Sequence, residues 1–138
     1  MIAYIDTSVV LRLMFREPKP LKESPRVKKA FASRLLAVEL GRAIDRARLA
    51  GTINDDEVAT LRGEADAAVA SIALVGLTDS ILERASDPMP TSLKTLDALH
   101  LATAVELRAE TEGELLFATH DSRLANAAKA MRFKVIGV

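Results

Sequence analysis

The sequence predicts an α/β fold in three layers, α/β/α, with a central parallel sheet of about five strands that helices cover on both faces. Short apolar segments rich in β-branched residues alternate along the chain with longer segments whose apolar residues recur at helical spacing. Strands separated by helices are joined by right-handed crossovers, which make a sheet parallel. The 138 residues match the usual size of one domain, and no repeat or linker divides them, so we expect residues 1–138 to form a single domain.

The first part of the chain is expected to hold two strands. Ile2–Ile5 is an apolar, β-branched run that ends in Asp-Thr-Ser, a pattern typical of a buried strand that leads into a helix. Prolines between residues 18 and 25 then interrupt the chain. After them we expect a helix, a short second strand within Ala32–Val38, and a further helix that begins near Glu39.

Capping residues mark the elements in the middle of the chain. Asn54 and Glu57, three residues apart, form a capping pattern for a helix, and a strand is expected over Ser71–Leu77. Thr78 is expected to cap a short helix. A long helix with one apolar stripe is predicted over Leu93–Glu110.

The chain is expected to end with a strand, a helix and a strand. Glu114–Thr119 is the predicted fourth strand, Asp121 opens the last helix, and Lys134–Val138 is the predicted fifth strand. Ligands of parallel sheets bind beyond the carboxyl ends of the strands. Candidate functional residues are therefore sought where strands end.

Composition excludes several classes of protein. The chain has no cysteine, so disulfides, thiolate zinc sites and cysteine nucleophiles are absent. Asp6 and Arg12 interrupt the apolar start of the chain, which argues against a signal peptide, and no apolar run approaches the roughly 18 residues of a membrane span. We expect a cytoplasmic protein without a membrane partner.

Charge gives no global argument for nucleic-acid binding, because 19 basic residues balance 19 acidic ones. Basic residues do gather between Arg16 and Arg34. This segment is either a positive patch that meets phosphates or a solvated helix face, and the sequence leaves both interpretations open.

Four acids fall where the chain reaches the carboxyl edge of the predicted sheet or packs beside it: Asp6, Glu39, Asp97 and Asp121. Singly, Asp6 and Asp121 are ordinary caps and Glu39 an ordinary acid near a helix start. Asp97 borders the apolar stripe of its helix, where an unpaired carboxylate is costly to desolvate. If the four converge, no nearby Lys or Arg is placed to neutralise them, so a hard divalent cation such as Mg²⁺ or Mn²⁺ is the simplest partner.

Four segments resemble, in order, the motifs of the PIN domain, closest to VapC-type toxins of type II toxin–antitoxin (VapBC) systems. They are Tyr-Ile-Asp6-Thr-Ser, Val-Glu39-Leu, Leu-Asp97-Ala-Leu-His and Ala-Thr119-His-Asp121. The resemblance spans nearly the whole chain and implies a PIN-like fold and endoribonuclease activity. It assigns the four acids as catalytic residues and as ligands of Mg²⁺ or Mn²⁺, which would activate water to hydrolyse RNA phosphodiesters.

Other polar residues neighbour these acids. The hydroxyl-bearing neighbours are Thr7, Ser8, Thr119 and Ser122. They are candidates to hydrogen-bond a metal-bound water or a phosphate, although hydroxyls at helix starts more often act as caps. His100 lies one turn from Asp97 and is a candidate to orient it, or else a satisfied core histidine. His120 is a candidate RNA contact.

The resemblance also implies partners. Besides the RNA substrate, it implies a VapB-type antitoxin whose C-terminal segment lies in a groove beside the acids and presents a basic side chain to them. It further implies a homodimer.

The sequence also leaves different functions open. A haloacid-dehalogenase-like phosphatase places Asp after the first strand as well, but it needs a second Asp where this chain has Ser8. No Gly-x-Ser-x-Gly elbow or Gly-rich phosphate loop is present. Two further candidates are a catalytically silent PIN-like module that binds RNA or a protein, and a housekeeping PIN nuclease of RNA processing. The presence of all four acids disfavours the silent module.

Overall fold

The sheet contains five parallel strands in the order β3-β2-β1-β4-β5. In the computed structural model, which describes residues 1–138, the strands are β1 (Ile2–Ile5), β2 (Lys29–Ser33), β3 (Ala73–Val75), β4 (Leu115–Ala118) and β5 (Val135–Ile136). On the central strand, Tyr4 pairs with Phe31 of β2 on one side and with Phe117 of β4 on the other. The predicted parallel sheet is confirmed.

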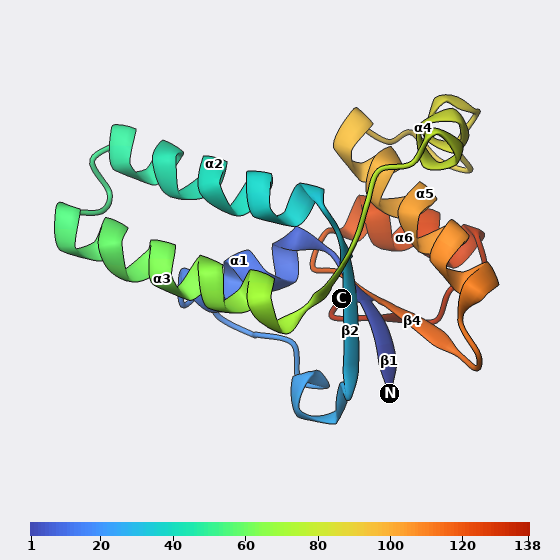
Figure 1. The fold of residues 1–138 in the computed structure, drawn as a ribbon, viewed down its shortest axis with the longest axis horizontal. Coiled ribbons are helices and arrows are strands. Elements are labelled where there is room, and N and C mark those ends of the chain that lie inside the picture. The colour runs from blue at the N-terminus through green and yellow to red at the C-terminus, as the bar shows by residue number, and fades with distance from the viewer.

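Helices cover both faces of the sheet. Figure 1 shows the strands with α1, α2 and α3 on one side and α4, α5 and α6 on the other. The helices are α1 (Thr7–Met14), α2 (Leu35–Leu49), α3 (Asp55–Ser71), α4 (Asp79–Ser86), α5 (Thr95–Glu110) and α6 (Ser122–Ala130), with one 3-10 turn, η1 (Ser24–Arg26). The predicted three-layer arrangement is confirmed. None of these helices combines the length and the apolar composition that a membrane span requires.

Two apolar cores lie against the two faces of the sheet. Alternate residues of β1 point in opposite directions, so Ala3 and Ile5 join the core under α1, α2 and α3. Tyr4 points the other way and joins the core under α5 and α6, together with Phe117. The strand that carries Asp6 at its end is therefore anchored on both faces.

The order of the strands creates a natural binding position. β1 lies between β2 and β4, and the chain proceeds outward from β1 in both directions. Crossovers that leave toward opposite faces diverge at such a point, and ligands of α/β sheets bind there. Asp6 follows β1 and Thr119 follows β4 at this position.

Three predictions for residues 24–39 were wrong. The helix expected before the second strand is only the turn η1, and β2 spans Lys29–Ser33 instead of lying within Ala32–Val38. Prolines lack the amide hydrogen that a continuous helix needs. Ser33 Oγ accepts the amide hydrogen of Leu35 at 3.2 Å, and this turn starts α2 at Leu35 instead of near Glu39.

The helix starts that were predicted from local capping residues were right. Asn54 and Glu57 form a capping box at the start of α3, and Thr78 accepts the amide hydrogen of Ile81 at the start of α4. The long helix α5 begins at Thr95, two residues later than the expected Leu93.

Candidate active site

Four acidic side chains gather at the carboxyl edge of the sheet. Asp6 follows β1 and Asp121 lies between β4 and α6, beside the point where the strand order diverges. Glu39 lies in the second turn of α2 and Asp97 in the first turn of α5, on helices from opposite faces of the sheet. The charges of Asp6, Glu39 and Asp121 all act on Asp97. The four predicted acids are therefore close enough to interact.

Asp6 is held by hydroxyl groups from two turns. Its Oδ2 accepts hydrogen bonds from Ser8 Oγ and, at 2.8 Å, from Thr119 Oγ1, and it also caps α1 through the amide of Ser8. The same two hydroxyls accept the amide hydrogens of His120 and Asp121. This network ties the turn after β1 to the turn after β4. It leaves Oδ1 of the buried Asp6 without a hydrogen-bond donor.

Glu39 is held through one of its two carboxylate oxygens. Its Oε1 accepts hydrogen bonds from Thr7 Oγ1 at 2.9 Å and from His100 Nε2 at 2.6 Å. Thr7 is the first residue of α1 and His100 lies on α5, and both are buried. Contacts from the two sides of the sheet thus meet on one oxygen, and Oε2 has no donor.

His100 connects Glu39 to the core through Tyr4. The Nδ1 atom of His100 lies 2.8 Å from the hydroxyl oxygen of Tyr4. Burial, and next the charge of Asp6, raises the pKa of Tyr4 well above its ordinary value, so the phenol keeps its proton. Burial lowers the pKa of His100, but the hydrogen bond to Glu39 and the surrounding carboxylates outweigh it and leave that pKa above its ordinary value.

The partner of His100 differs from the one expected from sequence. His100 was a candidate to orient Asp97, yet its hydrogen bonds go to Tyr4 and Glu39. Sequence reasoning also missed Tyr4 as part of the site. The available signal was its position two residues before Asp6, because side chains two residues apart on an extended backbone point in the same direction.

Asp97 is half-buried and makes no hydrogen bond or ion pair through its side chain. Burial is the largest cause that raises its pKa above the ordinary value, followed by the charges of Asp121 and Asp6. His100 partly offsets this repulsion. Both carboxylate oxygens of Asp97 are consequently free, at an energetic cost to the metal-free chain.

Asp121 caps α6, as predicted. Its Oδ1 accepts the amide hydrogens of Arg123 at 2.7 Å and of Leu124 at 3.0 Å. The cap fixes the direction of the side chain relative to the helix. Oδ2 has no donor, so capping leaves one oxygen of Asp121 for a ligand.

The donor set fits a hydrated hard cation. Each of the four acids has at least one oxygen without a hydrogen-bond donor, and no Lys or Arg forms an ion pair with any of them. Carboxylate oxygens are the ligands that Mg²⁺ and Mn²⁺ prefer. No group of three or more His, Asp or Glu side chains has the spacing of a preformed metal centre. Mg²⁺ commonly keeps several of its waters and binds one or two carboxylates directly.

The predicted neighbours of the acids have different roles. Thr7 and Ser8 donate to Glu39 and Asp6, so they orient acids and do not act as the helix caps that sequence favoured. Ser122 is exposed and forms no side-chain hydrogen bond. The imidazole of His120 contacts the backbone carbonyl of Gly137 through Nδ1, which ties the end of the chain to the turn after β4.

Comparison with known proteins gives the family. A family model described as PIN domain matches residues 3–130 of the chain. The chain belongs to the PIN-domain family. Among curated members, Ribonuclease VapC46 from Mycobacterium tuberculosis is 32% identical over 133 residues, which cover 96% of this chain and 95% of that protein. Ribonuclease VapC47 from the same species is 27% identical over 137 residues, which cover 94% of this chain and 92% of that protein.

A solved structure shares the PIN fold seen here. The crystal structure of VapBC2 from Rickettsia felis, bound to a DNA fragment from their promoter, contains a chain that superposes with a TM-score of 0.68. The alignment covers 98% of this chain and 97% of that chain at 8% identity. At such low identity the similarity concerns the fold alone.

Proposed function

We propose that this PIN-domain protein is a Mg²⁺- or Mn²⁺-dependent endoribonuclease and the toxin of a VapBC toxin–antitoxin pair. The observation that carries the proposal is the group of four carboxylates at the divergence of β1 and β4, each with a free oxygen and none paired with Lys or Arg. Two ribonucleases that align with nearly the whole chain support RNA as the substrate.

The four acids would together bind the hydrated ion. A bound Mg²⁺ or Mn²⁺ supplies a water of lowered pKa and positive charge beside the scissile phosphate. Asp6 and Glu39 are the rigid ligands, because hydroxyl and imidazole donors already fix one oxygen of each. Asp97 is unrestrained by hydrogen bonds, and a bound cation would offset its repulsion from Asp121.

Three exposed cations at helix starts are suited to hold the RNA backbone near the acids. Arg34 precedes α2, Lys94 precedes α5, and Arg123 lies in the first turn of α6. None of them forms an ion pair within the chain. Arg123 also lines a polar recess with Thr91, Ser92 and Asn126. Cations are needed here because the acids themselves repel phosphate.

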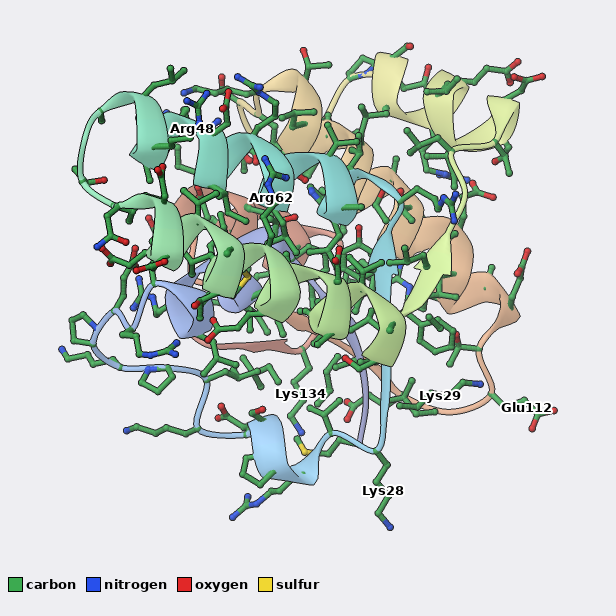
Figure 2. The ribbon with its side chains drawn as sticks, turned by 60° about the vertical axis from the view of Figure 1, so that its left-hand side comes forward. Lys28, Lys29, Arg48, Arg62, Glu112 and Lys134 are labelled. Atoms are coloured by element: carbon green, nitrogen blue, oxygen red, sulfur yellow. The ribbon has the colours of Figure 1, made fainter.

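Part of the basic segment noted in the sequence lies away from the acids. Lys28 and Lys29 stand at the amino end of β2, at the opposite end of the sheet from the acids (Figure 2). Arg16 is occupied by Glu64 at 2.8 Å. Arg34 lies at the carboxyl edge, just before α2, so the segment is divided between the two ends of the sheet and is not one surface that presents RNA to the acids.

An apolar groove beside α1 is suited to the antitoxin. It has a volume of about 630 Å³. The residues that line it include Val9, Leu13 and Met14 of α1, Val27, Ala68 and Ile72. Because α1 begins at Thr7, which contacts Glu39, an apolar segment lying along α1 can also bring a basic side chain to the acids. The VapBC complex from Rickettsia felis, which contains a chain of the same fold, supports a VapB-type partner.

A cleavage assay tests the proposed function. Purified protein is incubated with a pool of structured and single-stranded RNAs in Mg²⁺, in Mn²⁺ or in EDTA, beside Asp97→Asn. We expect products that require metal and disappear in the variant, with a loss exceeding the roughly 10–100-fold typical of residues that only support a metal ligand. RNA binding without products in any metal would instead support the catalytically silent module.

A further inference from the structure

We infer that Tyr4 and His100 form a positioning chain that holds Glu39 with its free oxygen directed toward the cation site. The inference rests on the proposed metal-dependent function and concerns how the chain prepares one ligand before the ion binds. Neither residue needs to touch metal or RNA. Both would act chiefly through Glu39, to which His100 Nε2 is hydrogen-bonded at 2.6 Å, whereas the same nitrogen lies 3.9 Å from Oδ1 of Asp6.

The positioning chain of Tyr4 and His100 begins at a rigid point in the core. Tyr4 is fully buried on the central strand, and its ring stacks on Phe117 with centroids 5.2 Å apart. Phe117 in turn packs against Phe133 at 5.6 Å. A tyrosine packed in this way has little rotational freedom, so its hydroxyl marks a fixed position for His100.

His100 transmits this position to Glu39. Its imidazole is 1% exposed, with Nδ1 facing Tyr4 and Nε2 facing Glu39. Because the carboxylate of Glu39 only accepts hydrogen bonds, Nε2 must carry a proton. In the neutral imidazole the hydroxyl of Tyr4 then donates to Nδ1, and in the cationic form both nitrogens donate. The contact with Glu39 is therefore the same in either state.

As a consequence, the two carboxylate oxygens of Glu39 differ in their contacts. His100 and Thr7 occupy Oε1, which leaves Oε2 as the oxygen free to bind a cation. α2 and α5 lie on opposite sides of the sheet (Figure 1). The hydrogen bond between Glu39 and His100 joins the two helices. Without it, a glutamate side chain samples several rotamers, and ordering it costs part of the binding free energy of the ion.

Mn²⁺ affinity, measured by electron paramagnetic resonance of the free ion, tests the inference without RNA. We expect His100→Leu to weaken Mn²⁺ binding roughly 10–100-fold, which is typical for the loss of a group that orients a ligand. His100→Gln should keep most of the affinity, because its amide nitrogen can replace Nε2. Tyr4→Phe retains the stacked ring but loses the hydroxyl, and a smaller loss than for His100→Leu is expected. Thermal unfolding in EDTA verifies that each variant is folded.

A double-mutant cycle separates positioning from a merely structural role. In a Glu39→Gln background, His100→Leu should cause little further loss of Mn²⁺ affinity, because His100 acts through Glu39. A folded His100→Leu or Tyr4→Phe protein with wild-type affinity would overturn the inference, as would losses that add fully in the double variant. If either outcome occurs and the wild-type protein still binds Mn²⁺ and cleaves RNA, the inference fails but the proposed function does not. Wild-type protein that binds no Mn²⁺ overturns both.

Discussion

At the scale of single residues, the site is defined by which carboxylate oxygens are used and which are free. Thr119 and Ser8 occupy one oxygen of Asp6, and Thr7 and His100 occupy one oxygen of Glu39. Asp97 has no donor at all. Hydrogen bonds thus stabilise Asp6 and Glu39, whereas Asp97 is destabilised by its burial and by neighbouring carboxylates. Mutations at these two kinds of position are expected to change stability in opposite directions.

We expect Asp97→Asn to raise the stability of the metal-free protein at neutral pH. Burial, and next the charges of Asp121 and Asp6, raises the folded-state pKa of Asp97, so folding favours the protonated carboxyl. The stability from this group is complete below its unfolded pKa and is lost as pH rises through the folded-state pKa. Asparagine is neutral throughout. Thermal unfolding in EDTA should show a gain at neutral pH and little difference near about pH 3.

Addition of Mn²⁺ should reverse this order, because an ion that binds only the folded state stabilises it. The thermal unfolding midpoint of the wild-type protein should rise, and that of Asp97→Asn should change little. Asp66→Asn, at an exposed position on α3, is the matched control and should follow wild type. A variant at position 97 that is less stable than wild type in EDTA at neutral pH would contradict the interpretation.

Thr119→Val should destabilise the fold by roughly 1–3 kcal/mol, because it leaves buried polar groups unpaired. The hydroxyl of Thr119 donates to Asp6 and accepts the amide hydrogen of Asp121, and the side chain is fully buried. Thr119→Ser keeps the hydroxyl and should retain most of the stability. Urea unfolding of the two variants measures the difference. A Thr119→Val protein as stable as wild type, beside a destabilised Thr119→Ser protein, would mean that packing of the methyl group, not the hydroxyl, matters at this position.

At the scale of elements, helix starts set by a capping residue were predictable from sequence. An element whose sequence fits both a strand and a helix was not. Asn54, Thr78 and Asp121 were identified correctly as caps, because a cap depends on residues within one turn. The start of α2 was misplaced because the apolar run after Ser33 fits a strand or a buried helix face equally well. The partner of His100 lies 61 residues away on another helix, and no local pattern indicates it.

The helix starts also predict where RNA is held. We expect Arg123→Gln to weaken RNA binding and to lower the salt dependence of the affinity by about one phosphate contact, because its guanidinium is exposed and free of ion pairs. Lys28→Gln removes an equal charge at the opposite end of the sheet and is the control (Figure 2). Filter binding in EDTA over a range of salt concentrations measures both. Equal effects of the two variants would exclude a specific surface at α6.

At the scale of the whole molecule, the order of strands explains why distant motifs form one site. The predicted alternation of strands and helices was enough to place Asp6 and Asp121 at the carboxyl edge, but not to show that β1 and β4 are neighbours. That adjacency depends on all the crossover connections between the strands taken together. The homodimer implied by the family resemblance stays a prediction, which sedimentation at micromolar concentration checks.

The groove beside α1 predicts a separable effect on toxicity. Leu13 is 63% exposed and lines the groove, so Leu13→Asp should prevent neutralisation by a co-expressed VapB-type antitoxin while the chain still arrests growth. Leu49→Asp changes a residue that is 68% exposed at the far end of α2, outside the groove, and should still be neutralised. Growth curves with and without the antitoxin measure this. Normal neutralisation of Leu13→Asp would show that the antitoxin binds elsewhere.

The most direct test of the central claim compares Mn²⁺ occupancy with the rate of RNA cleavage in the same samples. The protein is titrated with Mn²⁺, and free ion and RNA products are measured at each concentration. If the four carboxylates hold the catalytic ion, the two curves share one midpoint, both shift together in Glu39→Gln, and both Mn²⁺ binding and cleavage are lost in Asp97→Asn. Cleavage that persists in EDTA, or full occupancy without cleavage of any RNA, would contradict a metal-dependent ribonuclease.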